Sequence, residues 1–203
     1  GFDASAALGM RGVRDVLPIT GGIAVLADNT WRAFRAAEAV LCDWGPSPYT
    51  PDSAAQEAAV TAAFDGDRDS RFRDEGDVQE TAEGMTVVEA EYHVPYLAHA
   101  PLEPMTAMVL LAGRRLDIWT GTQIPRFVQD RAAAKAGLEP EEVHVHAIQS
   151  GGSFGRRLED DYVLQAVEIA VQVPDVPVKL TWSREEDFAH DFPRPMALAR
   201  GRA

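Results

Sequence analysis

The chain has 203 residues, of which 46% are hydrophobic and 25% are charged, an ordinary balance for a globular protein. A chain of this length can bury one sizeable core or two small ones. Its 32 acidic and 19 basic residues give a net charge of −13. That charge argues against nonspecific binding to nucleic acid or to an anionic membrane surface, so an anionic cofactor would need a local basic pocket.

Cys42 is the only cysteine, which excludes an internal disulfide and any cysteine-based zinc or iron–sulfur site. No run reaches the roughly 18–20 apolar residues of a transmembrane helix, and no signal peptide is visible at the start. Because the chain begins with Gly rather than Met, we expect a processed or excised product. Bacterial cytoplasm and periplasm both stay open as its location.

The first third of the chain alternates strand and helix patterns. Strands are expected at 23–27 and 41–44, and Asp28, Asn29 or Thr30 can cap a helix that runs to about residue 40. Thr50-Pro51 is typical of an N-cap followed by a first-turn proline, which predicts a second helix to about residue 64. A charged stretch at 65–77 is the best candidate linker. We therefore expect a small α/β lobe at 1–77 and a second domain at 78–203.

The second part of the chain opens with strand patterns. Strands are expected at 85–92, 107–112, 115–120, 143–148 and 178–182, with a turn at Gly113-Arg114. Helices are expected at 123–136, ended by Gly137, and at 159–171, and Ser183 with Glu186 predicts a short capped helix. The mixture indicates an α+β fold.

The loop Gly151-Gly-Ser-Phe-Gly-Arg-Arg157 lies between an expected strand and helix. Its glycines let backbone N–H groups approach a ligand, and Arg156 and Arg157 carry charge suited to phosphate. The loop is neither a P-loop nor a dinucleotide-binding fingerprint. Taken alone, it is more typical of a structural turn before a helix than of a binding loop. Gln123 offers a neutral amide elsewhere in the chain.

Several segments together carry a family resemblance. They are His99-Ala-Pro-Leu-Glu-Pro-Met105, Trp119-Thr-Gly-Thr-Gln-Ile-Pro125, the loop 151–157, Trp182-Ser-Arg-Glu-Glu-Asp187 and His190-Asp-Phe-Pro-Arg194. In order and spacing they resemble the molybdenum-binding subunit of the xanthine dehydrogenase/aldehyde oxidase family, with Phe154 31 positions after Gln123. The nearest branch is that of isoquinoline 1-oxidoreductase beta subunits and bacterial molybdenum aldehyde dehydrogenases. The match over residues 6–63 is weaker.

The resemblance implies a hammerhead-like lobe followed by part of a mixed α/β molybdopterin-binding domain. It implies that Gln123 hydrogen-bonds an oxo ligand of molybdenum and that Phe154 and Gly155 place main-chain N–H groups beside the metal centre. Gly151, Gly152 and Arg156 are the other expected cofactor-binding residues, and no side chain of this chain is expected to ligate the metal.

The resemblance also implies partners and chemistry. The cofactor would be molybdopterin, commonly the cytosine dinucleotide form in bacteria, with iron–sulfur clusters on a partner small subunit. The parent protein would oxidise an aldehyde or N-heterocycle with oxygen derived from water. The family's Gly-x-Gly-Glu base motif is absent from these 203 residues, so we expect the chain to be a portion of its subunit, inactive alone.

Two departures from the family pattern bear on specificity. Ser153 and Arg156 replace loop glycines, and Leu158 stands where purine-oxidising members have a glutamate. Because leucine cannot hydrogen-bond a purine, an aldehyde or apolar N-heterocycle is the expected substrate.

Other polar residues have simpler interpretations. His99 and Glu103 lie in a proline-containing segment that we expect to be a loop near the cofactor rather than a metal site. His144 and His146 are expected to be exposed or satisfied strand histidines. A non-catalytic partner- or anion-binding module and an unrelated phosphate-binding enzyme remain the alternatives. The position of Gln123 relative to Phe154 distinguishes these interpretations. The family interpretation requires both residues to line one cleft, and it fails if they lie on opposite faces.

Overall fold

The structure is a computed structural model that describes residues 1–47, 52–67, 69–76 and 84–203. The chain forms two compact units. Unit 1 consists of Gly1–Trp44 and Ala98–Phe192, and unit 2 of Gly45–Leu97 and Pro193–Ala203. The expected domain boundary at residue 77 lies inside unit 2, and the division into 1–77 and 78–203 stays a prediction.

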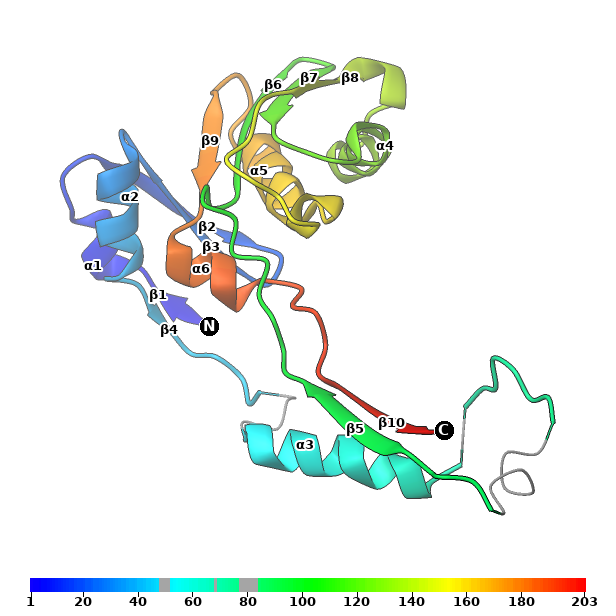
Figure 1. Cartoon of the computed structure of the whole chain (residues 1–203). Coiled ribbons are helices and arrows are strands. Elements are labelled where there is room, and N and C mark those ends of the chain that lie inside the picture. Colours follow the sequence, from blue (N-terminus) through cyan, green and yellow to red (C-terminus); the bar gives the residue numbers. More distant parts are fainter. Residues whose placement is uncertain (48–51, 68, 77–83) are drawn as a thin grey trace. The chain divides into compact units, whose positions relative to one another are not determined.

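A four-stranded mixed sheet forms the centre of unit 1, in the order β8-β7-β6-β9 (Figure 1). The antiparallel hairpin of β6 (Thr106–Ala112) and β7 (Arg115–Thr120) was predicted from sequence and turns at Gly113, whose φ is +59°. β9 (Val178–Thr181) pairs antiparallel with β6. β8 (Val143–Ala147) pairs parallel with β7, which makes the sheet mixed.

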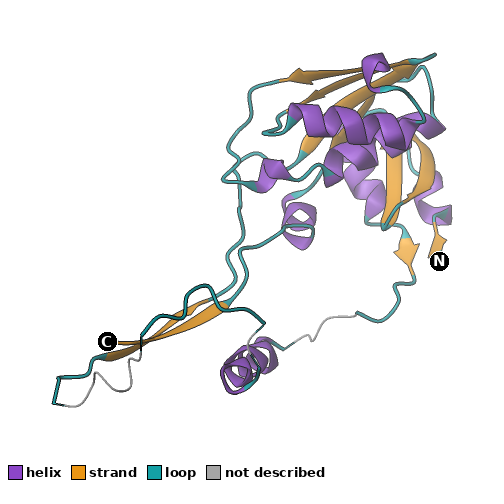
Figure 2. Ribbon diagram, turned by 90° about the vertical axis from the view of Figure 1, so that its right-hand side faces the viewer, coloured by secondary structure: helices purple, strands orange, loops and turns teal. Residues whose placement is uncertain are grey.

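Two helices cover one face of this sheet, α4 (Pro125–Ala136) and α5 (Asp161–Gln172) (Figure 2). Alternate residues of each strand point toward them, as the period of two in a strand requires. The core between the layers is apolar and includes Met105, Val109, Leu116, Ile118, Val128, Val143, Tyr162, Val163, Val167 and Trp182. This core fixes the ends of β7 and β8, from which the segments of the candidate site emerge.

The N-terminal part of unit 1 contains a hairpin, β2 (Val13–Ile19) and β3 (Gly22–Ala27). β3 was predicted and β2 was not, because charged residues and a proline interrupt its apolar pattern. The helix α2 (Thr30–Ala37) begins as predicted, with the Asn29 side chain accepting a hydrogen bond from the N–H of Arg32. The short elements β1 (Phe2–Asp3), α1 (Ser5–Leu8) and β4 (Leu41–Cys42) complete this part.

Unit 2 contains α3 (Ser53–Ala62), the 3₁₀ turn η1 (Ala63–Asp65) and a two-stranded antiparallel ribbon of β5 (Glu89–Val94) and β10 (Ala197–Arg202). Asp52 caps α3 by accepting the N–H of Ala54. The expected start at Thr50-Pro51 lies outside the described residues. The strand expected at 85–92 begins later and extends farther, because its residues pair with those near the C-terminal end of the chain.

Several element ends differ slightly from expectation. α4 begins at Pro125 and not at residue 123, so Gln123 precedes the helix, while Gly137 ends it in the left-handed conformation as predicted. The short elements η3 (Pro140–Glu142), η4 (Arg156–Leu158) and α6 (Arg184–Ala189) join the remaining segments. The Ser183 side chain accepts the N–H of Glu186, as expected for the start of α6.

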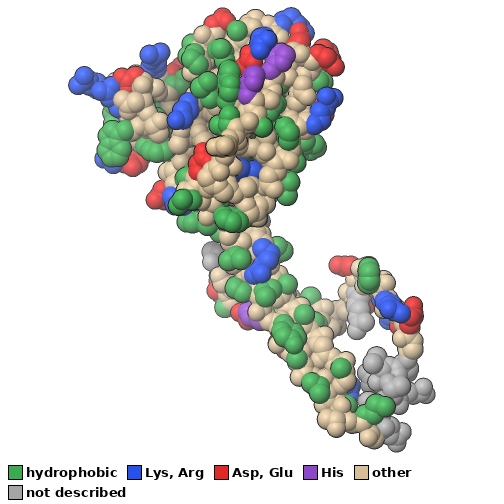
Figure 3. Space-filling view, turned by 45° about the horizontal axis from the view of Figure 1, so that its top comes forward, with side chains coloured by type: hydrophobic (Ala, Val, Ile, Leu, Met, Phe, Trp, Pro, Cys, Tyr) green, Lys and Arg blue, Asp and Glu red, His purple; other side chains and the backbone are tan. Residues whose placement is uncertain are grey.

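The combination of separate helices and mixed sheets confirms the α+β class. Basic and acidic side chains are interspersed over the face shown in Figure 3. Within the described ranges, no helix has both the length and the apolar character needed to cross a bilayer.

Candidate functional site

The Gln123 segment and the glycine loop emerge from the same edge of the sheet. The Gln123 segment follows β7 and the loop follows β8, and these two strands are parallel neighbours. Carboxyl ends of parallel strands meet at one edge, which is where open α/β sheets commonly bind ligands. The N–H of Ile148 donates to the carbonyl of Thr120 at 3.0 Å and holds the two exits together.

Gln123 contacts the loop directly. The Ser153 hydroxyl donates a hydrogen bond to Gln123 Oε1, and the Gln123 N–H donates to the carbonyl of Arg157 at 3.1 Å. Phe154, the residue after Ser153, is 78% exposed. The tertiary structure therefore brings Gln123 beside the loop that carries Phe154, two segments separated by about thirty positions in the sequence.

The loop presents free backbone donors. The N–H groups of residues 152–155 make no hydrogen bond to any residue that the structure describes. Three of these residues have positive φ: Gly152 (+101°), Phe154 (+55°) and Gly155 (+107°). Consecutive N–H groups in such a turn form a concave donor surface for an anion or an oxo oxygen. Phe154 is in a conformation that non-glycine residues adopt only at some cost, a feature often found at functional loops.

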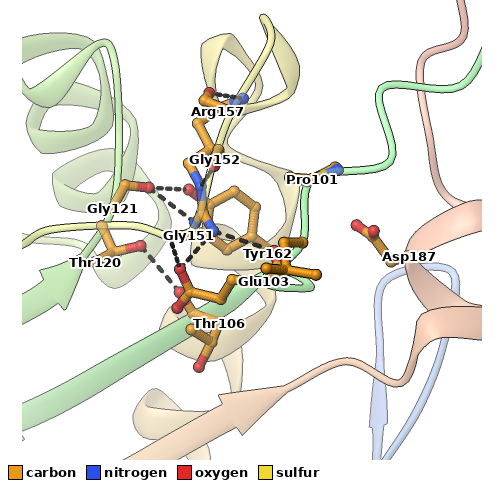
Figure 4. Close-up of polar contacts among 12 residues, drawn as sticks. Pro101, Glu103, Thr106, Thr120, Gly121, Gly151, Gly152, Arg157, Tyr162 and Asp187 are labelled. Carbon is orange, nitrogen blue, oxygen red and sulfur yellow. Dashed lines mark hydrogen bonds and ion pairs between the residues drawn. The ribbon is translucent and has the colours of Figure 1, made fainter.

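A buried arginine holds the loop from the inside (Figure 4). The Arg157 side chain is 1% exposed, and it donates to the carbonyl of Gly152 at 3.1 Å, to that of Gly121 at 3.2 Å and to Glu103 Oε2 at 3.2 Å. Glu103 Oε2 also accepts the N–H of Gly151 at 2.6 Å. Arg157 therefore ties the glycine loop to both of the neighbouring segments.

The tight packing at this clamp explains two glycines. A Cβ at Gly151 would lie 2.7 Å from Glu103 Cβ, and one at Gly121 would lie 2.6 Å from Ser150 Cβ. The Tyr162 hydroxyl donates to the Gly121 carbonyl at 2.7 Å. Burial raises the pKa of Tyr162, so the phenol keeps the proton that it donates.

Arg156 is also turned inward, which differs from the expectation that both guanidinium groups are available to a phosphate. Its fully buried side chain makes a bidentate pair with Asp161 at 3.0 and 2.9 Å, and its N–H donates to the carbonyl of Ser153. A buried charge requires such pairing, because desolvation is otherwise costly. Arg156 supports the loop from beneath, and its direct role at a cofactor stays a prediction that these contacts do not favour.

Glu103 and Ser153 were not singled out as site residues from the sequence. Glu103 lies in a loop, as expected, and its carboxylate contacts the glycine loop and Arg157. Within the described ranges, no three His, Cys, Asp or Glu side chains are placed to hold a metal ion. The donors at the loop are neutral N–H, amide and hydroxyl groups. Such donors fit oxo or phosphate oxygens of a ligand.

His146 agrees with its interpretation as a satisfied strand histidine. Its Nε2 lies 2.9 Å from Asp117 Oδ1, and its ring stacks on Trp119 with centroids 4.9 Å apart. This contact lies on the strands β7 and β8, and the histidine is not part of the loop site.

Comparisons with known proteins place the chain in a family. Residues 63–203, more than half of the chain, match the model of the molybdopterin cofactor-binding domain. The chain is 30% identical to isoquinoline 1-oxidoreductase subunit beta from Brevundimonas diminuta, over 97% of this chain and 26% of that protein. It is 27% identical to a membrane-bound aldehyde dehydrogenase [pyrroloquinoline-quinone] from Gluconacetobacter polyoxogenes, over 91% of this chain and 24% of that protein.

A solved structure shows the same fold. The aldehyde oxidoreductase from Desulfovibrio gigas superposes with a TM-score of 0.73 and 20% identity, over 100% of this chain and 27% of that one. The chain thus spans about a quarter of the length of these relatives. Given the matched family model and the loop geometry, this chain belongs to the molybdopterin cofactor-binding domain family.

Proposed function

We propose that this chain forms one wall of the molybdopterin site of a molybdenum-dependent oxidoreductase. The observation that carries the proposal is the hydrogen bond from Ser153 to Gln123, which joins the amide to a loop with four free N–H groups. The family match over residues 63–203 supports the identity of the cofactor. The activity belongs to the whole parent protein. This chain spans about a quarter of the length of its relatives.

The residues have distinct roles in this proposal. Gln123 Oε1 accepts from Ser153, which orients the amide and leaves its Nε2 donors for an oxygen of the ligand. The N–H groups of residues 152–155 hold a second, negatively charged oxygen of the ligand. When bound, the molybdenum cofactor supplies two-electron oxidation with oxygen taken from water. The chain's own part is to bind and orient the cofactor.

The substrate proposal is an aldehyde or apolar N-heterocycle. Leu158, the last residue of η4, is 51% exposed, and its N–H donates to the carbonyl of Gly155 at 3.0 Å. Together with exposed Phe154, it places apolar side chains beside the loop, and neither of them can hydrogen-bond a purine. The relatives named above include a protein called an aldehyde dehydrogenase and one called an isoquinoline oxidoreductase.

We further propose the cytosine dinucleotide form of the cofactor, an iron–sulfur small subunit as partner, and the rest of the parent subunit as the other wall of the site. The single cysteine of this chain cannot hold an iron–sulfur cluster, so electrons would leave through another chain or domain. The 203 residues alone are expected to be inactive.

The test uses the longest natural chain that contains these residues, produced in a bacterium that makes molybdopterin. Molybdenum is measured by mass spectrometry, pterin by fluorescence after oxidation, and the nucleotide by chromatography after acid release. Gln123→Leu should lower molybdenum retention about tenfold, the value of one well-placed hydrogen bond. Arg126→Ala, an exposed position at the start of α4, is the matched control and should retain the wild-type content.

Two results would overturn the proposal. A folded protein with neither molybdenum nor pterin would favour the alternative of a non-catalytic anion- or partner-binding module. A folded protein that carries pyrroloquinoline quinone and no molybdopterin would show that its cofactor is the one printed in the name of the Gluconacetobacter relative.

A further inference from the structure

A histidine and a buried carboxylate lie directly beneath the glycine loop. Asp191 Oδ1 is 2.8 Å from His99 Nδ1, and Asp191 Oδ2 accepts the main-chain N–H of His99 at 2.8 Å. The Asp191 side chain is only 4% exposed. These two residues are 92 positions apart, and only the folded chain brings them together.

The carboxylate determines how the imidazole is protonated. Burial alone raises the pKa of Asp191, but hydrogen bonds from His99 outweigh it, and the pKa lies below its usual value. Arg156 Nε, 3.5 Å from Asp191 Oδ1, adds a positive neighbour. An ionised carboxylate can only accept, so Nδ1 of His99 carries a proton. In the neutral ring Nε2 then has a lone pair and is a hydrogen-bond acceptor.

The acceptor nitrogen lies against Gly155. A Cβ placed on Gly155 would be 3.3 Å from His99 Nε2 and 3.5 Å from Cδ2, so the ring packs on the bare Cα of that glycine. The Nε2 atom makes no hydrogen bond to any described residue and is not one of the buried unpaired polar atoms. With 22% of the side chain exposed, an acceptor reaches the surface beside the free N–H of Gly155.

We propose that His99 is a ligand-binding residue whose Nε2 accepts a hydrogen bond from an N–H or O–H group of the bound cofactor, with Asp191 as its positioning residue. The inference rests on the proposed function, since it concerns the same loop. A ligand that satisfies both sets of partners carries anionic oxygens for the loop N–H groups and a donor group close to them. A phosphorylated heterocycle with ring N–H or amino groups has this combination.

Chemical modification tests the position of Nε2. Diethyl pyrocarbonate acylates accessible, unprotonated imidazole nitrogens, and peptide mass spectrometry locates the product. His99 of the longest natural chain should react at least about tenfold faster after the cofactor is removed than before. His146, paired with Asp117 away from the loop, is the control and should react equally in both states. Equal reactivity of His99 in both states, in protein that holds the cofactor, would overturn the inference.

Two substitutions separate binding from folding. His99→Asn keeps an N–H donor for Asp191 but has no atom at the position of Nε2, and it should retain about tenfold less molybdenum and pterin. His99→Gln can place an amide oxygen near the Nε2 position and should retain more cofactor than His99→Asn. If folded His99→Asn protein retains as much cofactor as wild type, the inference is wrong. If that variant does not fold, the protection of wild-type His99 from diethyl pyrocarbonate by the bound cofactor decides whether the inference holds.

The positioning role of Asp191 has its own readout. In Asp191→Asn the side chain has one acceptor oxygen for the three donors that the carboxylate now serves, the main-chain N–H groups of His99 and Phe192 and His99 Nδ1, so the proton of His99 is no longer held on Nδ1. Imidazole ¹⁵N shifts should then move toward the Nε2–H tautomer, and unchanged shifts would contradict the role. If wild-type protein contains no molybdopterin, the proposed function fails and this inference fails with it. If the cofactor is present and His99 is unprotected, only this inference fails.

Discussion

At the scale of single residues, the candidate site depends on charges that face inward. Arg157 is surrounded by carbonyl oxygens of three segments and by Glu103, and it is 1% exposed. From the sequence, the Arg156-Arg157 pair indicated a phosphate-binding charge. In the fold, the same charges organise the loop, and the donors left without a partner at the loop are neutral N–H groups.

The first prediction concerns this clamp. Arg157→Met keeps much of the side-chain volume but removes the guanidinium, leaving Glu103 and the carbonyls of Gly121 and Gly152 with fewer partners. Because breaking a buried ion pair leaves an uncompensated group, the free energy of unfolding should fall by about 3–5 kcal/mol. Urea unfolding followed by circular dichroism measures this change.

The matched control for the clamp is Arg126→Ala, which removes an arginine whose pair with Asp130 is mostly exposed. It should change the free energy of unfolding by less than about 1 kcal/mol. A similarly small effect of Arg157→Met would show that the clamp contributes little to the stability of the fold.

At the scale of elements, the local pattern predicted most of unit 1 and failed where pairing overrides it. The hairpin of β6 and β7 and the helices α4 and α5 follow their apolar periodicity and turn residues. β2 was missed because charged residues and a proline interrupt its apolar pattern, whereas pairing with β3 forms the strand in the fold. On the strands β7 and β8, Asp117 pairs with Arg115 and His146. The local sequence pattern does not reveal this polar cluster.

The second prediction concerns how the stabilisation contributed by Asp117 depends on pH. Hydrogen bonds from Arg115 are the main reason that the pKa of Asp117 lies well below its usual range. Burial acts in the opposite direction, and His146 adds to the lowering. Since the folded pKa is below the unfolded value near 3.9, the stabilisation is complete above pH of about 4 and is lost as pH falls toward the folded pKa.

Asp117→Asn should therefore cost about 1 kcal/mol at pH 7, a modest value because Arg115 is largely exposed. The difference from wild type should shrink as pH is lowered from about 4 to 3. Urea unfolding of both proteins across this range measures it. A difference that stays constant with pH would mean that the charge of Asp117 is not what stabilises the strand.

At the scale of the whole molecule, the two units differ in how much they bury. Unit 1 holds the apolar core between the sheet and α4 and α5. In unit 2 every residue of β5 is exposed, and the described residues of α3 include no buried side chain. The ribbon of β5 and β10 therefore has backbone pairing but little apolar support.

The third prediction follows from this difference. In hydrogen exchange of the 203-residue chain, the amides of β5 and β10 should be protected at least about tenfold less than those of β6 and β7, because local opening of the ribbon exposes almost no buried surface. Mass spectrometry of peptides covering both regions measures the rates. Comparable protection in the two regions would indicate that the ribbon is stabilised by contacts other than its own strand pairing.

The sequence by itself determined the family resemblance, the α+β class and the segments of the candidate site. These depend on glycines, helix caps and apolar periodicity that act within a few residues of one another. Only the tertiary structure decided which groups line the candidate site. The parallel pairing of β7 with β8 brings Gln123 to Ser153, and burial turns Arg156 and Arg157 inward. The meeting of His99 with Asp191 likewise depends on contacts between distant segments, which no local pattern records.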